Sequence, residues 1–190
     1  MAHWFLEPGH SAAEFAARHM MVTSVRGHFK DVHGHLELDL DSPIGASVEV
    51  TIDAKNVSTG EAARDAHLRS ADFLDVEHHA AIRYQGNVTR IESAHEWTVD
   101  GDLTIRGVTR PVQLRVKYLG QWSTPWWDGK ADLGPKLRAG FVASARIHRS
   151  EFGVSWNSPL ERGGIVVSDE LDLTIDAEAV LGEPPPGAGY

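Results

Sequence analysis

Three ionisable residues, Arg64, Asp65 and His67, lie within one short stretch of the chain. In a helix, the i, i+3 spacing places Arg64 and His67 at neighbouring positions of one face. Two interpretations stay open: an acid–base cluster of an enzyme that acts on an amphipathic substrate, or a salt bridge that fixes a loop. The sequence contains neither a Gly-x-Ser-x-Gly nucleophile motif nor a Gly-rich phosphate-binding loop, so no standard catalytic motif supports the enzyme.

Eleven histidines raise the question of a metal site. His33 and His35 would share one face of a strand, which is a usable start for two ligands. No third ligand is identifiable from the spacing, and we predict no metal site, with a histidine-based metal binder kept as an alternative hypothesis. The chain has no cysteine, which excludes disulfides, thiol catalysis and zinc sites that contain Cys.

Three tryptophans, Trp122, Trp126 and Trp127, stand close together beside Pro125 and Gly129. This composition suggests a long hairpin loop rather than the centre of a strand. Clustered indoles could mark the mouth of a ligand site, a surface that touches a membrane or an oligomer contact. They could equally pack back onto the protein's own fold.

The composition is that of a soluble globular domain. The chain has 190 residues, 42% hydrophobic and 24% charged, and a formal net charge of −9. Nucleic acids and anionic membranes bind basic patches, so we expect neither as a partner. The N-terminus has no basic segment followed by a long apolar run, and no stretch is apolar enough for a membrane span, so we expect a cytoplasmic protein.

The dominant sequence pattern is an alternation of apolar and polar residues. It recurs over residues 36–40, 48–52, 82–84, 97–105, 112–118, 141–147 and 171–175. Such half-polar strands belong to antiparallel sheets, and we expect about eight of them, most joined as hairpins. The predicted fold class is all-β: an eight-stranded antiparallel barrel, a size that can hold one small ligand.

The connecting residues predict turns and one helical insertion. Residues 85–87 and 106–107 suit tight turns, and Gly101 suggests a bulge or a bend within a strand. Ser58 and Glu61 have the spacing of a capping box, which predicts a short helical insertion near residues 58–75. A second short helix over residues 16–26 is weakly indicated. The Pro/Gly-rich tail over residues 182–190 is expected to be disordered, which leaves residues 1–181 as one domain.

The inward positions of the strands predict the lining of the barrel. Small inward residues such as Ala139, Ala143 and Ala145 leave volume that an ordinary core would fill, because voids are costly. A hydrocarbon ligand could occupy that volume. The predicted lining positions are Leu38, Val50, Ile52, Ile82, Tyr84, Trp97, Val99, Leu114, Val116, Phe141, Ala143 and Leu173.

Several motifs in register resemble the YceI-like family of lipocalin-like, polyisoprenoid-binding proteins. The motif residues are His10, Ser11, Phe15, His19, Gly27 and Phe29; Ser58 to Glu61, Arg64, Asp65, His67 and Leu68; Asp72 to Asp75; Gly101 to Val112; and Arg149 to Gly153. The resemblance covers about residues 4–180. It implies an elongated eight-stranded barrel with a lengthwise apolar tunnel, and it implies that homodimers are common.

The resemblance implies non-catalytic binding of a long apolar lipid, of polyisoprenoid or isoprenoid-quinone type, for sequestration or transport. No other cofactor is expected. The motifs place Arg64, His67 and Arg149 outside the alternating runs, which makes them candidates for contact with a polar headgroup. A pyrophosphate would need such cations, whereas a quinone would need only one or two donors.

Overall fold

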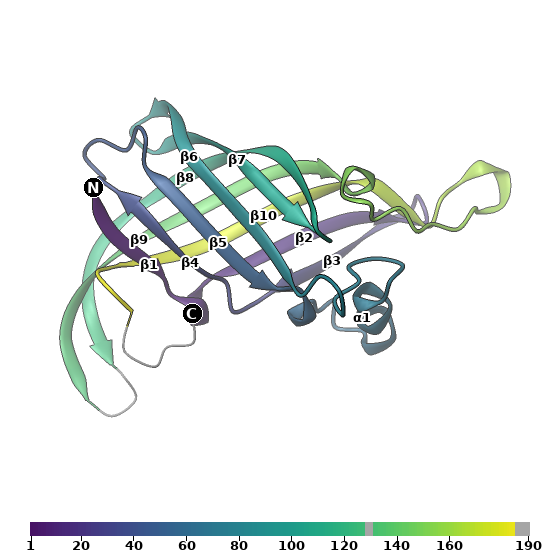
Figure 1. The fold of residues 1–190 in the computed structure, drawn as a ribbon, viewed down its shortest axis with the longest axis horizontal. Helices are drawn as coiled ribbons and strands as arrows, with labels where there is room; N and C mark the ends of the chain where they lie inside the picture. The colour runs from purple at the N-terminus through teal and green to yellow at the C-terminus, as the bar shows by residue number, and fades with distance from the viewer. Residues whose placement is uncertain (128–130, 185–190) are drawn as a thin grey trace.

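The chain folds into one twisted, antiparallel β-sheet that curls into an elongated barrel (Figure 1). The computed structural model describes residues 1–127 and 131–184. The strands are β1 (Ala2–Leu6), β2 (Ala12–His19), β3 (Thr23–Phe29), β4 (His33–Leu38), β5 (Ser47–Asp53), β6 (Ala81–Ser93), β7 (Glu96–Ile105), β8 (Val108–Trp127), β9 (Asp132–His148) and β10 (Val167–Leu181). The helical elements are α1 (Ala62–Arg69) and the 3₁₀ turns η1 (Pro8–His10), η2 (Ala54–Asn56), η3 (Arg149–Phe152) and η4 (Glu161–Gly163).

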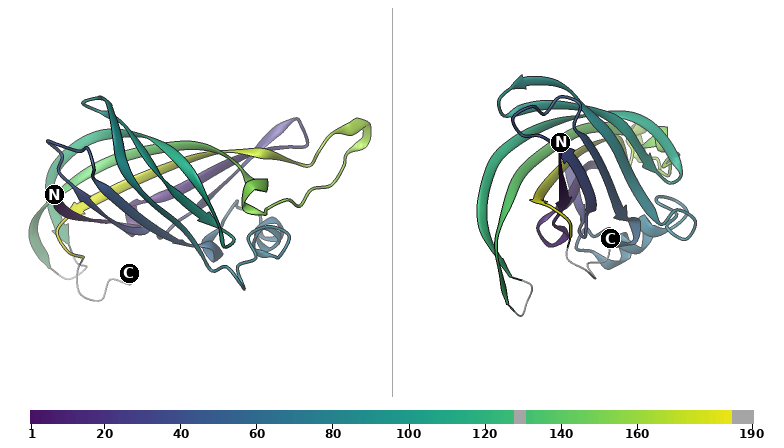
Figure 2. Two further views of the ribbon diagram at one scale, coloured as in Figure 1. Left: turned by 45° about the horizontal axis from the view of Figure 1, so that its top comes forward. Right: turned by 60° about the vertical axis from the view of Figure 1, so that its left-hand side comes forward.

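Eight of these strands close the barrel. The sheet runs in the order β1-β4-β5-β6-β7-β8-β9-β10, and β1 also pairs with β10. Trp4 shows the closure, since it is paired with Leu36 of β4 on one edge and with Leu181 of β10 on the other. The predicted eight-stranded antiparallel barrel is therefore confirmed. Figure 2 shows the curled sheet in two further views.

The remaining strands, β2 and β3, extend the sheet beyond this ring. β10 is 15 residues long, so its C-terminal end pairs with β1 and its preceding part with β2. The turn η1 separates β1 from β2. The helix considered for residues 16–26 is wrong, because these residues belong to β2, β3 and the turn between them. Pairing with β10 outweighs the helical propensity of the alanines in β2.

Two glycines that suggested a turn and a bulge lie instead inside regular strands. β6 continues through residues 85–87, so the turn predicted there is wrong. Gly86 is paired with Gly101, and Gly101 with Val112, without a register shift, so the bulge predicted at Gly101 is also wrong. A Cβ atom at Gly101 would overlap the carbonyl oxygen of Gln85 on the neighbouring strand and would lie 2.7 Å from Cζ of Tyr84. The glycine therefore makes room for the tyrosine ring.

The turn predicted at residues 106–107 is confirmed. Ile105 and Val108 are paired across it, and both Arg106 and Gly107 have positive φ angles, of 51° and 72°. Positive φ at both central residues is the geometry of the two-residue hairpin turn that matches the twist of the strands.

The helical insertion predicted near residues 58–75 is confirmed by α1, although its cap differs from the prediction. Glu61 is the N-cap, and its carboxylate accepts hydrogen bonds from the backbone N–H groups of Ala63 and Arg64. Ser58 pairs instead with His28 of β3 through two backbone hydrogen bonds of 2.9 and 3.0 Å. This pairing anchors the start of the insertion to the barrel. Within the part of the chain that the structure describes, no helix is long and apolar enough to cross a lipid bilayer.

The three clustered tryptophans belong to β8, so the prediction that they lie in a loop is wrong. β7 pairs with β8 only as far as Lys117, and beyond it β8 and β9 continue as a projecting hairpin (Figure 1, lower left). Trp126 is buried against Phe5, edge to face, with ring centroids 6.0 Å apart. Trp122 and Trp127 are 77% and 64% exposed. One indole thus packs onto the barrel and two face solvent.

The C-terminal segment leaves the barrel beside β1. The backbone N–H of Gly182 donates to the carbonyl of His3 at 2.9 Å, and the Glu183 carboxylate lies 3.7 Å from the His3 ring. Most of the tail predicted to be disordered, residues 185–190, lies outside the described residues. Disorder of this tail stays a prediction.

Candidate functional site

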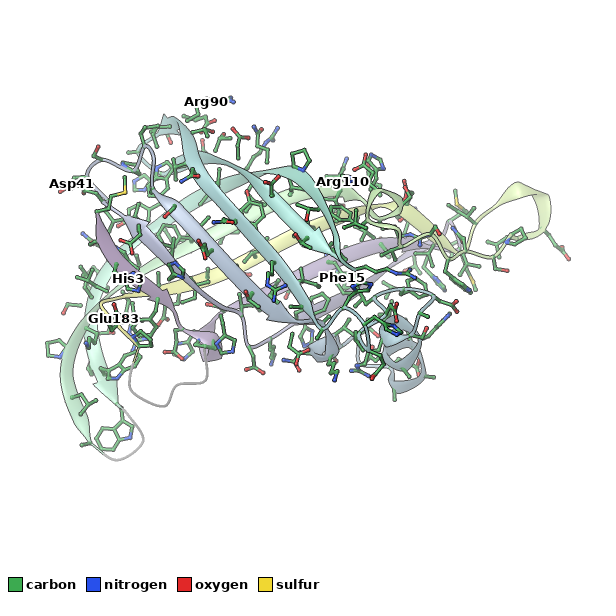
Figure 3. The ribbon with its side chains drawn as sticks, in the orientation of Figure 1. His3, Phe15, Asp41, Arg90, Arg110 and Glu183 are labelled. Carbon is green, nitrogen blue, oxygen red and sulfur yellow. The ribbon has the colours of Figure 1, made fainter. Side chains whose placement is uncertain are left out.

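Two apolar cavities lie inside the sheet. The cavity next to α1, which we call the helix-end cavity, has a volume of about 250 Å³. The second, which we call the mid-barrel cavity, has a volume of about 190 Å³. Five residues border both cavities: Phe15, Phe29, Ile82, Ile105 and Leu173. The two cavities therefore adjoin at this apolar constriction, of which Phe15 is labelled in Figure 3.

The structure places all twelve predicted lining positions on the wall of the mid-barrel cavity. Ile82 and Leu173 also border the helix-end cavity. Their common position follows from the alternation, because every second residue of a strand faces the same side of the sheet. Contact of these side chains with a ligand stays a prediction.

Part of the wall escaped the sequence analysis. Ala13 and Phe15 of β2, Phe29 of β3 and Leu36 of β4 also border the mid-barrel cavity. The signal was present but weak, because Ala13, Phe15 and Ala17 alternate with Glu14, Ala16 and Arg18, of which only two are polar. It was missed because the same stretch contains several helix-forming alanines.

Tyr84 is the buried polar side chain on the mid-barrel wall. Its hydroxyl lies 3.0 Å from the carbonyl of Val112 and 3.3 Å from that of Val99, and it donates to these acceptors. Burial raises the pKa of Tyr84 well above its ordinary value, so the phenol stays neutral. The charged residues that border this cavity, Glu14 and Arg83, are both exposed. A chain held in this cavity would therefore meet an almost entirely apolar surface.

The headgroup candidates Arg64, His67 and Arg149 all border the helix-end cavity. Arg149 is only 6% exposed. Its guanidinium donates to four backbone carbonyls, those of Ser168, Val154, Trp156 and Val167, at 2.8–3.3 Å. Burial lowers the pKa of Arg149 from its ordinary value, and this effect is opposed by the charge of Asp169. Arg149 thus fixes the turn after β9 and brings a buried positive charge to the cavity.

Arg64 is held by a neighbouring threonine. Its Nε donates to Oγ1 of Thr59 at 2.7 Å, and one terminal nitrogen donates to the Thr59 carbonyl at 3.2 Å. The Asp65 carboxylate accepts hydrogen bonds from the Thr59 hydroxyl and N–H, at 2.5 and 2.8 Å. These bonds lower the pKa of Asp65, the largest effect coming from the Thr59 hydroxyl.

His67 is paired with a different acid. Its Nε2 lies 2.8 Å from a carboxylate oxygen of Asp72, and its ring packs edge-on against Trp156 and Phe73. Asp65 is bonded to Thr59, so the three residues of the cluster do not converge as an acid–base group. Arg64 and Asp65 both fix the loop through Thr59, and the predicted salt bridge is wrong in that no ion pair within 4.0 Å joins them among the described residues.

The histidines are distributed over the surface rather than gathered at one point. His35 stacks on His3 with ring centroids 5.5 Å apart. Nδ1 of His3 is hydrogen-bonded to Oε1 of Glu37 at 2.6 Å. Among the residues that the structure describes, no group of three or more His, Asp or Glu side chains is arranged to hold a metal ion.

The chain resembles known proteins over most of its length. The profile of the YceI-like domain matches residues 4–179. A UPF0312 protein of Serratia proteamaculans is 34% identical over 172 residues, which cover 90% of this chain and 81% of the relative. Protein YceI of Escherichia coli O157:H7 is 35% identical over 175 residues, 92% of this chain and 83% of the relative.

Solved structures show the same fold. The YceI protein of Campylobacter jejuni is 26% identical, with a TM-score of 0.70 over 87% of this chain and 90% of its own. A polyisoprenoid-binding domain from Saccharophagus degradans superposes with a TM-score of 0.61 at 14% identity, over 96% of this chain and 99% of its own. The sequence relatives, the profile match and the closed eight-stranded barrel agree, and the chain belongs to the YceI-like domain family.

Proposed function

We propose that the protein binds a long apolar lipid, of polyisoprenoid or isoprenoid-quinone type, in the two adjoining cavities, and sequesters or transports it without catalysing a reaction. The observation that carries this proposal is the apolar wall that continues from one cavity to the other across the constriction. A chain-like hydrocarbon fits such a space better than a compact polar substrate does. The solved relative described as a polyisoprenoid-binding domain supports the same class of ligand.

The energetics of burial are sufficient for this function. Each buried CH₂ contributes about 0.8 kcal/mol, so about ten buried carbons contribute about 8 kcal/mol before the costs of association. After an association cost of about 4 kcal/mol, about fifteen buried carbons would leave about 8 kcal/mol, which corresponds to a dissociation constant of about 1 μM. Useful affinity therefore needs no specific polar contact along the chain.

The proposal includes the absence of chemistry on the ligand. Asp65 and His67 are each engaged with another partner, Thr59 and Asp72, so neither is poised to act on a substrate in the helix-end cavity. A homodimer is a further prediction from the family resemblance, and sedimentation of the purified protein tests it.

Native mass spectrometry tests the proposal. Protein purified without detergent should carry an apolar ligand that organic extraction removes and chemical analysis identifies. The delipidated protein should then take up geranylgeraniol in a one-to-one complex. A protein that carries no ligand and takes up no geranylgeraniol would overturn the proposed function.

A further inference from the structure

The helix-end cavity has an uneven distribution of charge. Its wall includes five basic side chains and, among the described residues that line it, no aspartate or glutamate. The basic residues are Arg18, His19, Arg64, His67 and Arg149. This is unexpected for a chain with a net charge of −9. The mid-barrel cavity shows no such excess of basic residues, because the charged residues that border it are one acid, Glu14, and one base, Arg83.

Three of these cations have no carboxylate partner. Among the described residues, the ion pairs within 4.0 Å involve other arginines and several histidines, but not Arg18, Arg64 or Arg149. Asp169 acts on Arg149, and Asp65 on Arg64, only from beyond that distance. The hydrogen bonds that these arginines donate to described residues end on neutral oxygens: backbone carbonyls and the Thr59 hydroxyl. None of the three arginines is therefore in direct contact with a carboxylate of a described residue.

The structure also fixes the direction of one of these cations. Asp65 accepts the hydroxyl proton of Thr59, which leaves an Oγ1 lone pair that accepts from Nε of Arg64. Nη2 of Arg64 donates to the Thr59 carbonyl, while Nη1 makes no hydrogen bond to a described residue. Arg64, which borders the cavity, is thus held in place by Nε and Nη2, and its Nη1 donors are not used by a described residue. Arg18 is exposed and borders the same cavity, so the wall reaches the surface there.

We propose that the helix-end cavity binds the anionic head of a single-chain amphiphile, a carboxylate or a phosphate, while its hydrocarbon chain passes the Phe15 constriction into the mid-barrel cavity. This inference rests on the proposed function and narrows it to ligands with a negatively charged head. Arg64 and Arg18 supply charge-assisted hydrogen bonds to the head, and the buried Arg149 supplies positive potential behind it. An apolar wall along the chain and cations at one end are the two features that such a ligand requires.

The test compares three probes that share one chain and differ in the head: hexadecanoate, hexadecyl phosphate and hexadecan-1-ol. Each displaces the neutral dye N-phenyl-1-naphthylamine from the delipidated full-length protein. We expect at least one of the two anions to displace the dye at a concentration about tenfold or more below that of the alcohol, because one charge-assisted hydrogen bond accounts for about that factor. The comparison of the two anions identifies which head the cavity prefers.

Three variants test whether the preference for the anions over the alcohol arises in the helix-end cavity. Arg64→Gln should reduce the advantage of the anion about tenfold and leave the affinity for the alcohol unchanged. Thr59→Val keeps the charge of Arg64 and removes the hydroxyl that positions it, so it should reduce the advantage by a smaller factor. Arg90→Gln is the matched control, because Arg90 is exposed and lies away from α1 (Figure 3).

The outcomes separate this inference from the proposed function. Equal affinities for the alcohol and both anions would overturn the inference and leave the lipid-binding proposal intact. An anion advantage that persists unchanged in the Arg64→Gln, Arg18→Gln double variant would also overturn it. If no probe displaces the dye or is taken up, both proposals fail.

Discussion

The substitution Ala143→Leu places a larger side chain on the wall of the mid-barrel cavity and so reduces the volume of this cavity. Ala143 of β9 is paired with Val116 of β8 and Ile175 of β10, and all three border this cavity. Leucine adds three carbons, which would take the place of about three carbons of a bound chain. At about 0.8 kcal/mol for each, the affinity for a long polyprenol should fall by about 2.4 kcal/mol, or about 60-fold. The free protein should keep its stability or gain up to about 2 kcal/mol, because the added carbons fill a void.

The assay pairs a binding measurement with an unfolding measurement. Displacement of the neutral dye by geranylgeraniol gives the affinity, and urea unfolding of the delipidated protein gives the free energy of unfolding. Ala16→Leu is the control, because Ala16 lies on β2 between Phe15 and Ala17, which face the cavities. Unchanged affinity in a stable Ala143→Leu variant would refute the placement of the lipid. A loss of stability of several kcal/mol would refute the claim that this volume is unfilled.

Three further predictions concern the scaffold. Asp65→Asn should lower the free energy of unfolding by about 1–2 kcal/mol at neutral pH. The pKa of Asp65 is lowered in the folded protein, so its contribution is present above the ordinary value of 3.8 and is lost as the pH falls through the folded value; urea unfolding across pH should show the two proteins converging in acid. Gly101→Ala should cost about 2–3 kcal/mol in urea unfolding, because the new Cβ would overlap the Tyr84 ring. Trp126→Ala should cost about 3 kcal/mol and expose the hairpin of β8 and β9 to proteases, whereas Trp122→Ala should change the stability by less than about 0.5 kcal/mol.

Each of these predictions has a contrary result. A constant difference between the wild type and Asp65→Asn from neutral to acid pH would show that ionisation of Asp65 does not stabilise the fold. A wild-type free energy of unfolding for Gly101→Ala would contradict the close approach of the tyrosine ring. Equal effects at Trp122 and Trp126 would contradict the packing of Trp126 against Phe5.

The barrel and most of its lining follow from the sequence because the alternation depends on local geometry. In a half-buried strand, the residue that faces inward is fixed by parity, so Leu114, Val116 and Phe141 could be assigned to the interior without knowledge of their partners. The helical insertion was predictable for a similar reason, since it interrupts the alternation. The family motifs placed Arg64, His67 and Arg149 outside the alternating runs, and the structure shows all three on one cavity wall.

The remaining features depend on contacts between residues far apart in the chain. Gly86 and Gly101 look like turn or bulge residues in isolation, and only their pairing beside Tyr84 explains them. Residues 12–19 form a strand because β10 offers an edge with which to pair. Trp126 is buried because Phe5 of β1, far away in the chain, packs against it. None of these partners can be identified from spacing along one sequence.

A crystal structure of the delipidated protein after loading with geranylgeraniol would show whether the lipid occupies the two cavities. We expect elongated density that starts in the helix-end cavity, passes between Phe15 and Ile82, and ends beside Ala143 in the mid-barrel cavity. Density for the lipid only on the outer surface, or a barrel interior in which side chains have closed both cavities, would contradict this expectation.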